Sequence, residues 1–168
     1  DAQLKFFNSD GGESGACGNG TRCVADLISK EKNKKTITLT TQSGNLKSVI
    51  LGNNLVTTEI GGAKTKWNEI PLSEELNTLN LNIKINDINN NKHFGGTAIS
   101  VGNPHVIFFV DKIENFDIEK IGPQIENHKI FPEKCNVTIA KVINKNLIKV
   151  KVWERGAGLT KACGTAAC

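Results

Sequence analysis

Two glycine-rich loops each place a cysteine where it could act as an acid or a base. The first loop spans residues 10–20 (DGGESGACGNG), and the second spans residues 155–166 (RGAGLTKACGTA). Both contain the tripeptide Ala-Cys-Gly, with the thiols at Cys17 and Cys163, 146 residues apart. One such loop would be an ordinary turn, whereas two of them indicate that the same device is built twice.

A thiol removes a proton only when it is ionised. A free cysteine has a pKa of about 8.5, so only a few per cent of it is thiolate at neutral pH. A helix N-terminus can lower the pKa of a thiol by about a unit or more, and its free amides also bind carboxylates. Each loop therefore predicts a thiol beside a carboxylate pocket.

Two such thiols, on opposite sides of one carbon, could invert a stereocentre without a cofactor. One thiol would remove a proton from one face, and the other would return a proton to the opposite face of the planar carbanion. The two helix N-termini would stabilise the charge that builds on the neighbouring carboxylate. We therefore expect the two cysteines to face each other across a cleft between two halves of the protein.

The elements around the first loop are a short strand, a helix and a set of β-rich segments. Residues 3–7 form a plausible strand, and the spacing of apolar residues predicts a helix that begins at or just before Cys17 and extends towards Lys32. Residues 36–40, 46–51 and 55–60 are β-rich and separated by turns. This pattern predicts an antiparallel meander.

The second half repeats this plan. The glycine pair at 61–62 and the residues up to Pro71 break the pattern, which predicts half-domains at 1–65 and 66–168. Beyond the break we expect an asparagine-biased but ordered segment at 77–92 and a helix at 118–128. Strands are expected at 97–101, 106–110, 137–143 and 147–153. Because both halves lead through strands into a cysteine loop and a helix start, the chain reads as an internal duplication.

Composition excludes several classes of protein. The 168 residues are 38% apolar and 23% charged, which is typical of a soluble globular protein. The net charge of +4 is spread thinly, with one dense basic run at residues 32–35, so we expect no nucleic-acid partner. No stretch approaches the roughly 20 apolar residues of a membrane span, and no signal peptide opens the chain. We expect a cytoplasmic location.

The cysteines indicate neither disulfides nor zinc. Their number, five, leaves one unpaired in any disulfide framework, and no pair has the usual zinc-ligand spacing. We therefore expect reduced thiols and no metal, with Cys23, Cys135 and Cys168 as small buried residues. The chain contains no methionine and stops where a helix should begin, so we also expect a fragment.

Five sequence blocks together resemble the diaminopimelate epimerase family. This family interconverts LL- and meso-diaminopimelate without pyridoxal phosphate. The blocks come in the family's order and span nearly the whole chain. They are residues 7–13 (FNSDGGE), 16–23 (ACGNGTRC), 102–105 (GNPH), 131–136 (FPEKCN) and 154–165 (ERGAGLTKACGT).

The resemblance implies a role for each matching residue. Cys17 and Cys163 would be the acid–base pair, exchanging roles with the direction of the reaction. His105 would support Cys17, while Glu154 would neutralise a substrate ammonium and help to orient Cys163. Backbone amides would hold the reacting carboxylate, and other polar groups would grip the distal end of the substrate. The amides belong to Gly18, Asn19, Gly164 and Thr165, and the distal groups to Asn8, Asn103, Asn136 and Arg155.

The resemblance also implies an α+β fold of two pseudo-symmetric half-domains, each a mostly antiparallel sheet around a central helix, with the active site in the cleft between them. It implies no cofactor, a homodimer, and a place in lysine and peptidoglycan-precursor biosynthesis. Leu159 and Ala166 depart from the glutamate and glycine that many members carry there, which concerns local loop packing. We expect this 168-residue chain to be catalytically dead or nearly so, because only a stub of its second helix is present.

Three other functions are weighed against this one. A proline or hydroxyproline racemase would also have two cysteines, but a cyclic substrate needs no distal clamp, so Asn103, Asn136 and Arg155 argue against it. A thiol redox or metal-binding module needs vicinal cysteine pairs, and the sequence has no Cys-x-x-Cys. A cysteine hydrolase would leave the second loop unexplained.

Overall fold

The computed structural model describes residues 1–7, 11–15, 17–42 and 44–168. The chain forms two compact units, the first made of Asp1–Gly62 with Cys163–Cys168 and the second of Ala63–Ala162. The sequence placed the last six residues in the second half, whereas their contacts join them to the first unit. There the short helix α3 (Gly164–Ala167) contacts α1 (Gly18–Lys32).

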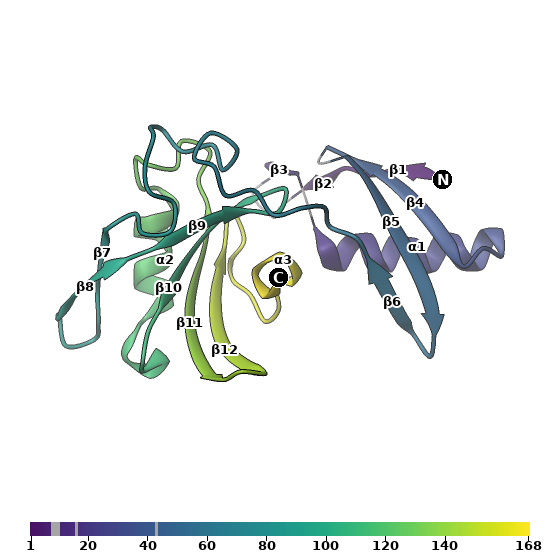
Figure 1. Ribbon diagram of the computed structural model, residues 1–168. Helices are drawn as coiled ribbons and strands as arrows, with labels where there is room; N and C mark the ends of the chain where they lie inside the picture. Colours follow the sequence, from purple (N-terminus) through teal and green to yellow (C-terminus); the bar gives the residue numbers. More distant parts are fainter. Residues whose placement is uncertain (8–10, 16, 43) are drawn as a thin grey trace. The chain divides into compact units, whose positions relative to one another are not determined.

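The first unit is a four-stranded sheet with α1 packed on one face (Figure 1). Strands β4, β5 and β6 are antiparallel, so the predicted meander is confirmed. Alternation along β4 turns Ile37 and Leu39 into the core, where they meet Ala25 and Ile28 of α1. The strands, in sheet order, are β1 (Ala2–Gln3), β4 (Thr36–Thr41), β5 (Gly44–Gly52) and β6 (Leu55–Thr58).

The strand expected at residues 3–7 is divided between two sheets. β1 pairs in parallel with β4, and the amide of Leu4 still donates to the carbonyl of Thr40 at 2.8 Å. The chain then leaves this sheet, and β2 (Phe6–Phe7) pairs with β3 (Glu13–Ser14) in a separate two-stranded ribbon. A run of apolar residues cannot reveal such a change of partner, because pairing depends on residues far along the chain.

The second unit contains a five-stranded sheet in the order β13-β12-β11-β10-β9. β10 and β11 are parallel, so the chain must cross over between them, and α2 (Ile118–Glu126) lies in that crossover. The predicted helix and the predicted hairpin of β11 and β12 are confirmed. The strands are β9 (Thr97–Ser100), β10 (Pro104–Phe109), β11 (Asn136–Asn144), β12 (Leu147–Glu154) and β13 (Gly158–Leu159).

The asparagine-rich segment is ordered, as predicted. It contains β7 (Ile83–Asn86), which pairs with β8 (Lys92–Gly95) in a hairpin. At the turn, the carboxylate of Asp87 accepts hydrogen bonds from the amides of Asn89 and Asn91 at 2.9 and 2.8 Å. Ile83 and Ile85 are buried on one side of β7, whereas Leu79 is 71% exposed.

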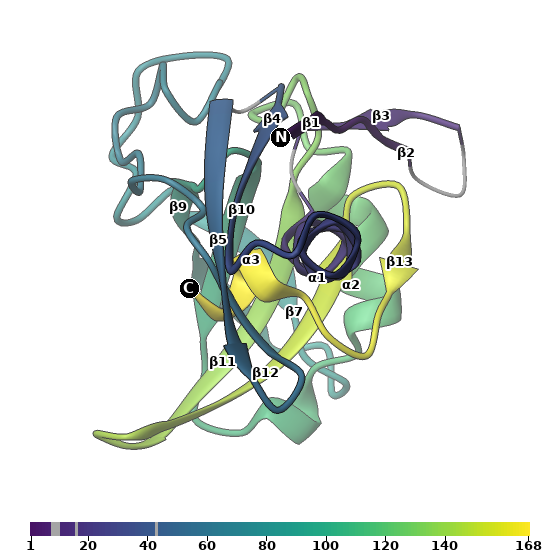
Figure 2. The same cartoon turned by 90° about the vertical axis from the view of Figure 1, so that its right-hand side faces the viewer.

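Sheets dominate both units and the helices are few, so the expected α+β class is confirmed. The view in Figure 2, turned by 90°, looks along α1. None of the helices in the described part of the chain is long and apolar enough to cross a membrane.

Candidate active site

Cys17 is the N-cap of α1, as the sequence predicted. Its backbone is extended (φ −148°), and its sulfur accepts a hydrogen bond from the Gly20 amide at 3.4 Å. The buried Thr21 fixes this start, because its amide and its hydroxyl both donate to the Cys17 carbonyl, at 2.9 and 2.8 Å. An N–H group aimed at the sulfur stabilises negative charge on it.

Cys163 occupies the corresponding place at the start of α3. Its backbone is also extended (φ −123°), and its sulfur lies 3.3 Å from the hydroxyl oxygen of Thr165. The Thr165 side chain is buried, whereas both cysteines are half-buried. The two thiols therefore share a position at a helix start but differ in the group that contacts the sulfur, an amide in one case and a hydroxyl in the other.

The residues that follow the two cysteines lie against each other. A Cβ atom placed on Gly18 would be 4.0 Å from the Cα atom of Gly164. A Cβ atom on Gly164 would in turn lie 3.9 Å from the side-chain oxygen of Asn19, which accepts from Arg22 at 2.5 Å. The first amides of a helix have no partner within the helix. The structure thus gathers the amides of both predicted carboxylate sites within one unit.

In the second unit, His105 joins Asn103 and Asn136 in one buried cluster. The His105 Nε2 atom lies 3.1 Å from Asn103 Oδ1 and 3.4 Å from Asn136 Nδ2. His105 and Asn136 are register partners in the parallel pair of β10 and β11, and the amide nitrogen of Asn136 also donates to the Pro104 carbonyl at 3.0 Å. Burial, together with the charge of Arg155, lowers the pKa of His105 to about 4, so this imidazole is neutral at pH 7.

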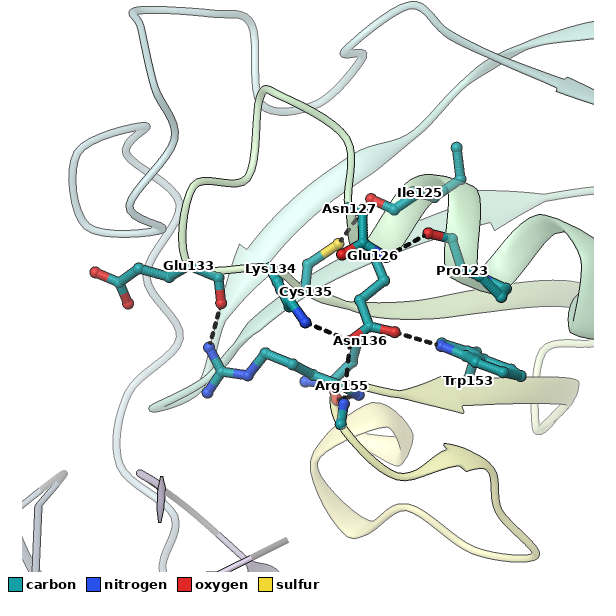
Figure 3. A network of polar contacts seen from close by, with 11 residues as sticks. Pro123, Ile125, Glu126, Asn127, Glu133, Lys134, Cys135, Asn136, Trp153 and Arg155 are labelled. Atoms are coloured by element: carbon teal, nitrogen blue, oxygen red, sulfur yellow. Dashed lines mark hydrogen bonds and ion pairs between the residues drawn. The ribbon is translucent and has the colours of Figure 1, made fainter. Parts of the chain in front are cut away.

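Arg155 follows β12 directly and is held at both its backbone and its side chain. Its amide donates to Asn136 Oδ1 at 2.9 Å, and its guanidinium donates to the Glu133 carbonyl at 2.8 Å (Figure 3). The adjacent Glu154 carboxylate accepts a hydrogen bond from the Thr160 hydroxyl. Arg155 and Asn136, which are 19 residues apart in the sequence, thus belong to one hydrogen-bond network.

This network contains a carboxylate that sequence reasoning missed. Glu126, at the end of α2, is only 6% exposed, and it accepts hydrogen bonds from Trp153 and from the Gly156 amide. The available signal was spacing: Glu126 lies four and eight residues beyond Gly122 and Ile118, which face the core. A charged residue at a core-facing position is rare unless it has partners.

The predicted site residues fall in two groups, and one of them lies outside the description. Cys17, Gly18, Asn19, Cys163, Gly164 and Thr165 belong to the first unit, and Asn103, His105, Asn136, Glu154 and Arg155 to the second. Asn8 falls on residues 8–10, outside the described residues. Within the described ranges, no group of three or more histidine, cysteine, aspartate or glutamate side chains is arranged to hold a metal ion.

The remaining cysteines divide differently from the prediction. Cys135 is buried, as expected, and burial raises the pKa of its thiol far above the usual range, with a further contribution from the charge of Glu126. Cys23 and Cys168 are exposed, so the expectation of burial is wrong for them. Cys23 lies on an exposed face of α1, and the Cys168 thiol donates to the Gly164 carbonyl at 3.3 Å without being covered.

Sequence comparison finds relatives that are described as diaminopimelate epimerases. A family described as "Diaminopimelate epimerase" matches residues 1–66 and 97–168. The diaminopimelate epimerase of Pelagibacter ubique (strain HTCC1062) is 74% identical over 168 residues, covering 100% of this chain and 61% of the relative. That of Acidiphilium cryptum (strain JF-5) is 44% identical over 167 residues, covering 99% of this chain and 58% of the relative. The chain thus spans about three fifths of the length of these curated relatives.

Solved structures show the same fold at low sequence identity. A probable proline racemase from Agrobacterium radiobacter K84, with bound carbonate, matches 98% of this chain and 53% of its own at a TM-score of 0.61 and 12% identity. A hydroxyproline epimerase from Agrobacterium vitis, with bound trans-4-hydroxy-L-proline, matches 98% of this chain and 52% of its own, with a TM-score of 0.59 and 12% identity. A PhzF-family protein from Bacillus anthracis matches 98% of this chain and 58% of its own, with a TM-score of 0.54 and 16% identity. At these identities the likeness concerns the fold alone.

Proposed function

Because the chain belongs to the diaminopimelate epimerase family, we propose that a version with the full length of its relatives interconverts LL- and meso-diaminopimelate. One observation carries the proposal beyond family membership. Both Ala-Cys-Gly cysteines cap helices in the structure, and the glycines that follow them lie against each other, with 4.0 Å from the Cβ position of Gly18 to Gly164 Cα. Two thiols at adjoining helix starts match what a two-base proton transfer requires.

In this mechanism one cysteine removes the α-proton as thiolate, and the other delivers a proton to the opposite face as thiol. The C–H bond breaks towards one sulfur, the electron pair stays on the α-carbon and its carboxylate, and a new C–H bond forms from the other sulfur. The protonation states of Cys17 and Cys163 are exchanged after one turnover. The reverse reaction starts from that exchanged state, so neither direction needs a cofactor.

The carbanion is the species that most needs stabilising. Its charge spreads onto the carboxylate, and the amides of Gly18, Asn19, Gly164 and Thr165 are proposed to bind that carboxylate. Fixed amide dipoles stabilise developing charge without the reorganisation that water would require. This assignment gives the two close-packed glycines a chemical role, because a backbone without side chains can approach an anion directly.

The polar cluster of the second unit is proposed to recognise the distal amino-acid end. Arg155 would bind the distal carboxylate through its planar guanidinium, and Glu154 would bind the distal ammonium. Asn103 and Asn136 would donate hydrogen bonds to this end of the substrate and accept hydrogen bonds from it. Asn8 is included on family resemblance alone. His105 would support Cys17. Such a clamp suits a long substrate with charge at both ends better than a cyclic imino acid.

The proposal is tested by incubating a full-length version with LL-diaminopimelate in D2O and following the α-hydrogens by NMR. We expect meso product with deuterium at the inverted carbon, and no exchange with L-proline or trans-4-hydroxy-L-proline. Turnover of the cyclic substrates but not of diaminopimelate would refute the proposal in favour of the racemase alternative. Light scattering of the same sample tests the predicted homodimer.

A further inference from the structure

The Glu126 carboxylate is a buried charge for which the proposed proton transfer has no use. Its Oε2 atom accepts from the Trp153 indole N–H at 2.7 Å, and its Oε1 atom accepts from the Gly156 amide at 3.1 Å (Figure 3). The Nζ atom of Lys134, on a half-exposed side chain, forms an ion pair with Glu126 Oε1 at the long distance of 3.9 Å. A buried carboxylate is costly unless its oxygens are hydrogen-bonded, and here each oxygen has an N–H donor.

These hydrogen bonds lead to the backbone that carries Arg155. The amide of Arg155 donates to Asn136 of β11 at 2.9 Å, and the next amide, that of Gly156, donates to Glu126 of α2. The Cα atom of Arg155 is therefore held on both sides by buried side chains from two different elements. Figure 3 shows the Glu126 side chain between Trp153 and the backbone that follows β12 at Arg155.

The Trp153 ring fixes the orientation of the carboxylate in turn. A Cβ atom on Gly122 of α2 would lie 2.3 Å from Trp153 Cγ, and a Cβ atom on Gly158 would lie 3.5 Å from the far end of the ring. The indole is thus packed closely against two glycine backbones and cannot turn away from Glu126 without displacing them. The indole of β12 is thus closely packed against α2 on one side and Gly158 on the other.

We propose that Glu126 is a positioning residue for Arg155, fixing the place from which the guanidinium reaches the distal carboxylate of the substrate. The inference rests on the proposed function, in which Arg155 binds that carboxylate. Glu126 itself would not touch the substrate. It acts by holding the Gly156 amide, and through it the backbone of Arg155.

The substitution Glu126→Gln tests this role with almost no change in shape. Two N–H groups need two acceptors, and glutamine offers only one oxygen, so its NH2 group must face either the indole or the Gly156 amide. Hydrogen bonds to charged groups are the stronger kind, so we expect KM for LL-diaminopimelate to rise at least tenfold in a full-length version. We expect kcat to fall less, because Arg155 binds a part of the substrate remote from the reacting carbon.

The discriminating measurement is a double-mutant cycle with Arg155→Ala. If Glu126 acts through Arg155, Glu126→Gln should change kcat/KM less than twofold once the guanidinium is absent. The matched control is Glu119→Gln, the same chemical change at an exposed position of the same helix, which should leave KM unchanged. All variants are assayed at a temperature where circular dichroism shows them folded, and Glu126→Asp replaces Glu126→Gln if the latter does not fold.

Equal losses of kcat/KM in the parent and the Arg155→Ala backgrounds would overturn the inference, because a general loss of stability would act in both. A KM within twofold of the parent value in Glu126→Gln would overturn it as well. If the unsubstituted full-length protein shows no epimerisation at all, the proposed function fails first. The two failures are therefore distinguishable.

Discussion

The backbones of Gly18 and Gly164 lie against each other, with a Cβ position on the first only 4.0 Å from the Cα atom of the second. Each glycine directly follows a helix-capping cysteine, so the starts of α1 and α3 adjoin within the first unit. The distance is that of an ordinary van der Waals contact, so the two helix starts pack directly side by side. The contact supports assigning Cys17 and Cys163 to one reaction centre.

The first prediction concerns these two thiols. In a full-length version, Cys17→Ala and Cys163→Ala should each lower epimerisation of LL-diaminopimelate by at least about a thousandfold, because each removes the proton carrier for one face. Either variant should retain slow exchange of an α-proton with solvent where the remaining thiol still acts as the base. Proton NMR in D2O separates this exchange from inversion.

The control for both variants is Cys23→Ala. Cys23 is an exposed thiol on α1, six residues from Cys17, and its loss should leave turnover unchanged. Turnover near that of the parent in either Cys17→Ala or Cys163→Ala would refute the two-base assignment. Strong inactivation of Cys23→Ala would show that damage to α1, and not loss of a proton carrier, explains the result.

The sequence predicted the local positions of the two thiols at helix starts better than it predicted contacts between distant residues. Residue types and spacing were enough to single out Cys17 and Cys163, since an Ala-Cys-Gly loop before a helix carries its own local signal. Trp153 carries no such signal, and the spacing of Glu126 indicates only that it faces the core. The importance of both residues arises from a contact between a helix and a strand, 27 residues apart in the sequence. The parallel pairing of β10 with β11 is equally non-local, and so is the contact that joins α3 to the first unit.

The second prediction concerns the packing of α2 on β12. Gly122→Ala should destabilise the protein by about 3 kcal/mol, since the new methyl group would lie 2.3 Å from Trp153 Cγ and must displace the ring. Urea unfolding of a full-length version measures the loss. The matched control is Gly95→Ala, where a Cβ atom meets nothing within 4 Å, and the expected change is below about 0.5 kcal/mol. Equal stability of the two variants would contradict the packing described here.

The third prediction concerns acid. The folded protein holds the pKa of His105 at about 4, mainly through burial, while an unfolded histidine titrates near 6.5. The unfolded state therefore binds a proton first as pH falls, so stability is fully present above about pH 6.5 and is lost as pH falls towards 4. The loss from this one group is about 3 kcal/mol over that window.

Two measurements check this assignment. The ring resonances of His105 should titrate near pH 4 in a full-length version, and His105→Gln should flatten the pH dependence of urea unfolding between about 6.5 and 4. Burial also lowers the pKa of His128, so His128→Gln serves as the comparison and should remove a smaller part of the slope. A His105 titration at pH 6 or above would contradict the burial argument.

The last prediction is that oxidation inactivates the protein by joining Cys17 to Cys163. The two sulfurs belong to the N-cap residues of α1 and α3, whose starts adjoin. A Cβ atom placed on Gly18, the residue after Cys17, would lie 4.0 Å from the Cα atom of Gly164, the residue after Cys163. A disulfide needs Cα atoms within about 7 Å, which a small shift of the short α3 could supply. Air oxidation of a full-length version should therefore abolish turnover, peptide mapping should show the Cys17–Cys163 bridge, and dithiothreitol should restore activity.

Cys23→Ser should oxidise and recover like the parent, since Cys23 takes no part in the bridge. Recovery of a Cys17–Cys23 bridge from the inactive protein, or inactivation with both thiols still free, would show that the two sulfurs do not share one site.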